Sequence, residues 1–162
     1  MRIADQTRKA EQFRALHIPG KPLVLFNIWD AGGAKAVAAG GAKAIATSSW
    51  SVAHANGFSD GEQTPLILAI ENLRRIVGAT VLPVTIDLES GYGDASEMVG
   101  ETIGLAIDAG AIGCNLEDSF PANGIGGSRV GQLQEIIAPR AQFASFGRLP
   151  RGVPVGHLPG LR

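Results

Sequence analysis

The sequence contains a single cysteine, Cys114, among its 162 residues. One cysteine cannot form an internal disulfide, and it cannot supply a thiolate metal cluster. Cys114 lies in the apolar stretch AIGCNL. We therefore expect a buried small side chain there rather than a reactive thiol.

The sequence also lacks an excess of one charge and any long apolar run. Its formal net charge is −1, which provides no overall positive field to attract nucleic acid or an anionic membrane. No apolar run approaches the roughly 18 residues of a membrane span. The polar N-terminus, MRIADQTRKAEQFRAL, has no apolar segment of the kind found in signal peptides. We predict a cytoplasmic protein with neither a nucleic-acid partner nor a membrane partner.

Acidic residues are absent from the last part of the chain. Residues 1–135 carry all 15 acidic residues, whereas residues 136–162 carry four arginines together with four prolines and four glycines. That stretch shows no sustained helical or strand period. We expect residues 140–162 to be an irregular tail, either a flexible segment or the product of a reading frame lost near Arg140.

Residues 1–139 form the predicted folded part. A hydrophobic fraction of 45% is enough for a buried core. Strand-like segments are predicted at 23–27, 42–49, 81–89 and 111–118, and helices at 6–16, 32–40, 64–79, 93–110 and 128–138, with a polar loop at 51–63. This alternation is typical of parallel α/β folds. The apolar run 23–27 predicts a strand buried on both faces, and Thr64 is predicted to cap the helix that follows it.

Polar residues follow each predicted strand. In order along the chain they are Asn27, Asp30, Thr47, Ser48, Ser49, Asp87, Glu89, Asn115, Glu117 and Asp118. Active sites of parallel α/β folds lie at the carboxyl ends of the strands, where these residues would meet. The acids Asp87, Glu89 and Glu117 suit a hard, oxygen-preferring cation such as Mg²⁺. The alternative is that they cap helices or pair with Arg and Lys.

Four segments carry a family resemblance: FNIWDAGGAKAVAAGG, ATSSWSVAHANGFSDGE, LPVTIDLESGYG and AGAIGCNLEDS. In this order and spacing, from about residue 21 to residue 140, the chain resembles the isocitrate lyase/phosphoenolpyruvate mutase superfamily. The resemblance implies an α/β fold of the parallel (β/α)8 TIM-barrel type, with residues 1–139 forming roughly the first four βα units. It also implies a Mg²⁺-dependent enzyme that acts on a small 2-oxo or 2-hydroxy carboxylate through an enolate-like intermediate.

The resemblance assigns the acidic residues. Asp87 would contact Mg²⁺ directly, whereas Glu89 and Glu117 would hold it largely through water. Asp60, in GFSDGE, would orient the substrate or a reacting group. Asp60 and Glu117 are therefore the candidate catalytic residues, and Asp60 also belongs to the substrate-binding set.

The resemblance places substrate binding in the loop after the second strand. Ser48, Ser49 and Trp50 would bind the 2-oxo acid, partly through backbone N–H groups. Magnesium together with such donors would stabilise the negative oxygen of an enolate.

Two departures from the family pattern reduce the number of candidate reactions. The Lys/Arg-Cys-Gly-His loop of isocitrate and methylisocitrate lyases is replaced by SFPANGIGGSRVG, which disfavours those two cleavages. The same loop holds only Arg129 where phosphoenolpyruvate mutase has basic residues. We therefore favour a carbon–carbon lyase, a decarboxylase or a hydrolase, with a phosphoenolpyruvate phosphonomutase-type activity as an alternative.

Length raises two further alternatives. A closed barrel usually takes about 250 residues, so the chain is interpreted as truncated, and a non-catalytic fragment is the second hypothesis. A half barrel would expose two strand edges, which predicts a homo-oligomer. The third hypothesis is a complete doubly wound domain that binds a phosphate-bearing ligand, but GGAKAVAAGG matches no phosphate-loop pattern.

Overall fold

The computed structural model describes residues 3–117. Its elements, in chain order, are α1 (Ile3–Ala15), β1 (Phe26–Ile28), α2 (Ala31–Ala39), β2 (Ile45–Thr47), α3 (Ser49–Ala55), α4 (Leu66–Ala79), β3 (Val84–Asp87), α5 (Ser96–Ala109) and β4 (Gly113–Asn115). The predicted helix at 128–138 and the predicted tail at 140–162 lie outside the described residues. Within residues 3–117, no helix combines the length and the apolar character needed to cross a membrane.

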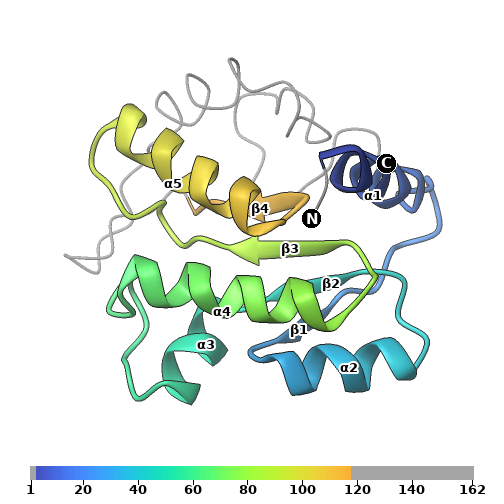
Figure 1. The fold of residues 1–162 in the computed structure, drawn as a ribbon, viewed down its shortest axis with the longest axis horizontal. Helices are drawn as coiled ribbons and strands as arrows, with labels where there is room; N and C mark the ends of the chain where they lie inside the picture. Colours follow the sequence, from blue (N-terminus) through green and yellow to red (C-terminus); the bar gives the residue numbers. More distant parts are fainter. Residues whose placement is uncertain (1–2, 118–162) are drawn as a thin grey trace.

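The four strands form one parallel sheet in the order β1-β2-β3-β4 (Figure 1). Phe26 pairs with Ile45, and Ile45 pairs with Val84, so the strands run in close register. Each connection between neighbouring strands contains a helix. Strand order that follows chain order is the pattern of a (β/α)8 barrel, whereas a doubly wound sheet reverses its order. The prediction of a parallel α/β fold is confirmed for the described residues, which contain four parallel strands joined through helices.

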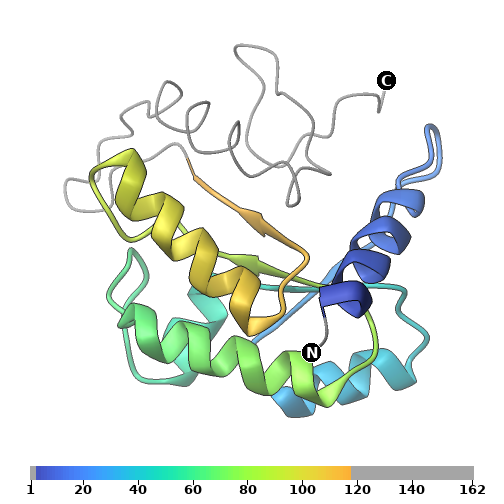
Figure 2. The same cartoon turned by 45° about the horizontal axis from the view of Figure 1, so that its top comes forward.

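Helices α2, α4 and α5 cover one face of the sheet (Figures 1 and 2). The core between them and the sheet contains Ile45 and Ile86 from the strands and Leu73 from α4, each almost fully buried. Because side chains alternate along a strand, Thr85 and Asp87 project toward the opposite face from Ile86. Asp87 is thereby directed away from the helical layer.

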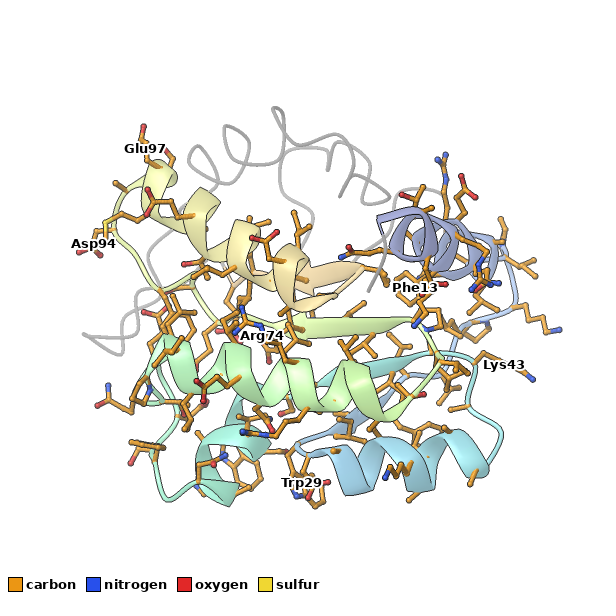
Figure 3. All side chains as sticks on the ribbon, viewed as in Figure 1. Phe13, Trp29, Lys43, Arg74, Asp94 and Glu97 are labelled. Carbon is orange, nitrogen blue, oxygen red and sulfur yellow. The ribbon has the colours of Figure 1, made fainter. Side chains whose placement is uncertain are left out.

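Helix α1 lies at the end of the sheet where the strands begin (Figures 1 and 3). Its Phe13 packs with Ala44 and Ile112, the residues just before β2 and β4. The side-chain amide of Gln6 donates hydrogen bonds to the carbonyls of Ile107 at 2.8 Å and Ala111 at 2.7 Å. Since α1 covers this end, the carboxyl ends of the strands lie at the other end of the sheet.

The prediction for the first strand is wrong in its burial. Strand β1 is Phe26–Ile28, and both Phe26, 52% exposed, and Asn27 are open to solvent. The reason is its position, because β1 pairs with β2 alone among the described strands. Leu23 and Leu25 precede the strand and pack near Phe13 instead.

Two local predictions after β2 are also wrong. The predicted loop at 51–63 begins with α3, whose buried residues Val52 and Ala53 anchor it and whose first turn is capped by Ser48. Thr64 does not cap α4, since the helix begins after Pro65 without any side-chain cap. Helix α5 ends as predicted, at Gly110, whose φ of 103° is the left-handed conformation that glycine adopts readily.

Candidate active site

Asp87, the last residue of β3, is held by the first residue of α3. Its Oδ2 accepts a hydrogen bond from the Ser49 amide at 3.1 Å and another from the Ser49 hydroxyl at 2.9 Å. Its Oδ1 accepts from the amide of Glu89 at 3.1 Å. A carboxylate has about four acceptor positions, so within the described part of the chain one position remains on Oδ1.

The backbone of Asp87 is fixed by a neighbouring strand. Its amide donates to the hydroxyl of Thr47, at the end of β2, over 3.0 Å. The backbone that carries the carboxylate is therefore fixed to β2, and Ser49 sets the orientation of the carboxylate itself. This explains why the sequence pairs a strand-end hydroxyl with an acid at the end of the next strand.

Glu89 lies two residues beyond Asp87 and is 5% exposed. Its Oε2 accepts a hydrogen bond from the amide of Glu62 at 2.5 Å. In turn, Oε1 of Glu62 accepts from the hydroxyl of Ser90 at 2.5 Å and from the amide of Tyr92 at 2.8 Å. The side chain of each glutamate thus accepts hydrogen bonds from the loop that carries the other glutamate.

Burial raises the pKa of Glu89 to about 7, and the negative charges of Asp60, Glu62 and Asp87 raise it as well. The hydrogen bond from the Glu62 amide acts in the opposite direction. The pKa of Tyr92 is also raised, first by burial and then by the negative charges of Glu89, Glu62, Asp87 and Asp60. The electrostatic character of this end of the sheet is therefore strongly negative.

Glu117 follows β4 and is joined to the loop after β3. Its amide donates to the carbonyl of Glu89 at 2.6 Å, and the amide of Leu88 donates to the carbonyl of Asn115 at 3.1 Å. These bonds continue the pairing of the two strands past Asp87. Glu89 and Glu117 consequently have neighbouring backbones at the carboxyl end of the sheet, as the sequence predicted.

The predicted substrate-binding residues surround the start of α3. Ser48 is its N-cap and accepts a hydrogen bond from the amide of Ser51 at 3.4 Å. Trp50 is 56% exposed and stacks on His54, with ring centroids 4.2 Å apart. Asp60 is exposed on the following loop.

A small pocket lies behind Asp87, between the sheet and the helices α3 and α4. Its cavity volume is about 10 Å³, which is room for about one water molecule. Its lining includes Ser49, Asn72, Asp87 and Glu89 as well as Thr64. The Thr64 hydroxyl is fully buried and meets no hydrogen-bond partner within residues 3–117.

The donor chemistry of this cluster suits magnesium, since Asp60, Glu62, Asp87 and Glu89 offer only oxygen. Among residues 3–117, no Lys or Arg forms an ion pair with any of these four. Buried carboxylates without a counter-charge are costly. However, no three His, Cys, Asp or Glu side chains of the described residues are gathered so that they could hold a metal unaided.

Other predictions near the site have clear outcomes. Asp30 caps α2, accepting from the amide of Gly33 at 2.6 Å, which is the alternative role considered for a strand-end acid. Cys114 is half-buried beside the core rather than fully buried as predicted, and burial of its thiol raises its pKa to about 12. Sequence reasoning missed Glu62, although it lies in the GFSDGE motif that identified Asp60.

Comparisons with known proteins agree with this geometry. The profile of the phosphoenolpyruvate phosphomutase family matches residues 13–145. An uncharacterised protein of Mycobacterium tuberculosis is 33% identical over 111 residues, which are 66% of this chain and 40% of that protein. The chain therefore spans less than half the length of this curated relative.

Solved structures have the same fold. The crystal structure of a candidate phosphonomutase from Burkholderia cenocepacia J2315 is 53% identical, with a TM-score of 0.75, covering 82% of this chain and 55% of that chain. A phosphonopyruvate hydrolase in complex with oxalate and Mg²⁺ is 22% identical, with a TM-score of 0.73, covering 88% of this chain and 49% of that chain. The second likeness supports the fold alone.

The family profile covers most of the chain, including every predicted site residue. The parallel sheet and the residues at its carboxyl end fit the TIM-barrel-type structures that the chain resembles. The chain belongs to the phosphoenolpyruvate phosphomutase family.

Proposed function

We propose that this chain carries the Mg²⁺-binding part of an active site that acts on a small 2-oxo or 2-hydroxy carboxylate. The reaction would be a carbon–carbon bond cleavage, a decarboxylation or a hydrolysis that passes through an enolate-like intermediate. The observation that supports it most is the carboxylate cluster around Asp87, which lacks a basic partner among the described residues.

In this proposal Asp87 would be the direct ligand. Ser49 donates two hydrogen bonds to Oδ2 and Glu89 donates one to Oδ1, so Oδ1 would be the oxygen left with a free acceptor position for the cation. Glu89 and Glu117 lie farther along the two neighbouring strand ends and would act largely through water. When bound, magnesium would supply a Lewis acid that stabilises negative charge on a substrate oxygen.

Substrate binding is assigned to Ser48, Ser49 and Trp50. The amide of Ser49 is engaged with Asp87 and that of Ser51 with Ser48. Within residues 3–117, the Trp50 amide meets no acceptor, and a helix leaves its first amides unpaired. This N–H is therefore available to a carboxylate or an enolate oxygen, and the side chains of Trp50 and Asp60 are both exposed.

Catalytic roles are proposed for Asp60 and Glu117. Both are exposed at the carboxyl end of the sheet, where a substrate bound by Ser48 and Trp50 would lie. Asp60 would orient the reacting group, and Glu117 would act next to the cation. A phosphonomutase reaction is the second candidate, favoured by the 53% identity to a candidate phosphonomutase.

Oxalate is a suitable probe because it is planar and dianionic, like the enolate of a 2-oxo acid. We expect the 162-residue chain to bind oxalate only when Mg²⁺ is present, as measured by isothermal titration calorimetry. Trp50→Ala keeps the backbone N–H and removes only the exposed indole, so it should weaken oxalate binding in part and leave Mg²⁺ binding unchanged. Oxalate binding of equal strength in EDTA would contradict the proposal. A matched control is Asp108→Ala, an exposed acid on α5 near the opposite end of the sheet.

A homo-oligomer and a cytoplasmic location stay predictions. Phe26, the first residue of β1, is 52% exposed and Val24, just before the strand, is 64% exposed, which supports self-association of the chain. Sedimentation equilibrium would test it, with Phe26→Ser expected to shift the chain toward the monomer. An unchanged mass for wild type and variant, equal to one chain, would contradict it.

A further inference from the structure

We propose that Glu62 is a positioning residue that holds the loop carrying Asp60 against the loop that follows β3. The inference rests on the proposed function, because the groups that it would place are Asp60 and Glu89. Glu62 lies two residues after Asp60 and 27 residues before Glu89 in the sequence. Its hydrogen bonds therefore join two loops that are far apart in the sequence.

The contact is reciprocal. The amide of Glu62 donates to Oε2 of Glu89 at 2.5 Å. The side chain of Glu62 accepts from the Ser90 hydroxyl at 2.5 Å and from the Tyr92 amide at 2.8 Å, both at Oε1. Hydrogen bonds to a carboxylate are about twice as strong as neutral ones. Three such hydrogen bonds join Glu62 to residues 89–92, and we call this set of contacts the Glu62 clamp.

The backbone at the clamp is unusual. Within residues 3–117, the non-glycine residues with positive φ are Glu62 at 60°, Glu89 at 51° and Tyr92 at 57°. Left-handed backbone costs such residues roughly 1–2 kcal/mol each. All three belong to the clamp, so the hydrogen bonds between the loops offset a conformation that neither loop would favour alone. Strain held by surrounding contacts is common at functional sites.

The clamp has a direct consequence for Asp60. This residue is exposed, and no hydrogen bond to its side chain is found among the described residues. Its position relative to Glu89 therefore depends on the anchoring of its loop. Glu62→Ala removes the acceptor at Oε1. Glu62→Gln keeps a carbonyl oxygen there and removes only the charge.

The test uses the full 162-residue chain with two measurements. Amide hydrogen exchange of Tyr92, followed by NMR in EDTA, reports the contact. The Mg²⁺ dissociation constant from calorimetry reports its role. For Glu62→Ala we expect Tyr92 to exchange at least tenfold faster and Mg²⁺ to bind about tenfold or more weakly, as for other supporting residues of metal ligands.

The matched variants separate hydrogen bonding from charge and from folding. Glu62→Gln keeps a carbonyl acceptor for Ser90 and Tyr92, so Tyr92 exchange should stay within about threefold of wild type. Because it removes a negative charge near the proposed cation site, Mg²⁺ binding should weaken, but less than in Glu62→Ala. Ser90→Ala removes one donor and should give an intermediate loss, which serves as the readout if Glu62→Ala does not fold. Asp108→Ala should change neither value.

Each contrary result has a distinct meaning. Unchanged Tyr92 exchange in Glu62→Ala would show that the contact does not exist. Faster exchange with an unchanged Mg²⁺ affinity would overturn the positioning role and leave a purely structural contact. If the wild-type chain binds no Mg²⁺, the proposed function and the positioning role both fail, whereas the exchange data still decide the contact.

Discussion

Ser49 donates two hydrogen bonds to the same oxygen of Asp87, one from its amide at 3.1 Å and one from its hydroxyl at 2.9 Å. Ser49 is the first residue of α3, which follows β2, and Asp87 is the last residue of β3, the strand next to β2. One carboxylate oxygen thereby receives two hydrogen bonds, whereas the other receives one, from the amide of Glu89.

The pair yields a first prediction. Ser49→Ala removes the hydroxyl donor but keeps the amide donor. The carboxylate of Asp87 therefore keeps one of its two hydrogen bonds at Oδ2 and is oriented less firmly. We expect Mg²⁺ binding to weaken about tenfold, the lower end of the range for residues that support metal ligands. Calorimetric titration of the variant measures this. A dissociation constant equal to that of wild type would show that the hydroxyl does not orient the ligand.

Glu89 makes stability depend on pH. Its pKa in the folded state is about 7, above the ordinary value of 4.5, because burial and neighbouring carboxylates disfavour the charge. The folded chain therefore binds the proton more tightly than the unfolded chain. The free energy of unfolding should fall as pH rises from about 4.5 to 7. Mg²⁺ should oppose this fall, so that it stabilises more at pH 8 than at pH 5.5.

Glu89→Gln is the matched variant, since it keeps an acceptor for the Glu62 amide and removes the charge. Urea unfolding at several pH values should show a flatter dependence for this variant than for wild type. Parallel curves for the two proteins would contradict the assignment.

Two buried threonines should respond in opposite directions. The hydroxyl of Thr64 is buried without a partner among the described residues, whereas that of Thr47 accepts from the Asp87 amide. Removing an unsatisfied polar group is neutral or favourable, and removing one partner of a buried pair costs about 1–3 kcal/mol. Thr64→Val should therefore raise the free energy of unfolding by about 1 kcal/mol, and Thr47→Val should lower it. Denaturant unfolding of both variants checks the signs, and equal losses would contradict the account.

Cys114 should be inert in the folded chain. Burial raises the pKa of its thiol to about 12 from an ordinary value of 9, so its thiolate fraction at pH 8 is about a thousandfold smaller. A chromogenic disulfide reagent should report no fast reaction at pH 8 in native conditions and one thiol per chain after denaturation. Rapid reaction of the native chain would show that the strand is open at this position.

The sheet could be predicted from the sequence because its signals are local. Apolar runs ending in polar residues indicated all four strands, and Gly110 marked the end of α5. The burial of Phe26 could not be predicted, because it depends on which strand lies beside β1. Helix α3 was missed since its sequence, SWSVAHA, is short and its stability comes from the buried Val52.

The site was predicted in part for the same reason. Asp87, Glu89 and Glu117 follow strands directly, and alignment of parallel strands brings them to one end. Glu62 follows no strand, and its role depends on a hydrogen bond to a residue 27 positions away. Such a contact between loops has no periodicity in the sequence and becomes visible only in the folded chain.

The most direct test is a calorimetric titration of Mg²⁺ into the metal-free 162-residue chain at pH 8, beside Asp87→Ala and the control Asp108→Ala. The account predicts one Mg²⁺ per chain for the wild type and the control, and no measurable binding for Asp87→Ala. Equal binding by Asp87→Ala and wild type, or none by the wild type, would contradict a magnesium site at the end of β3.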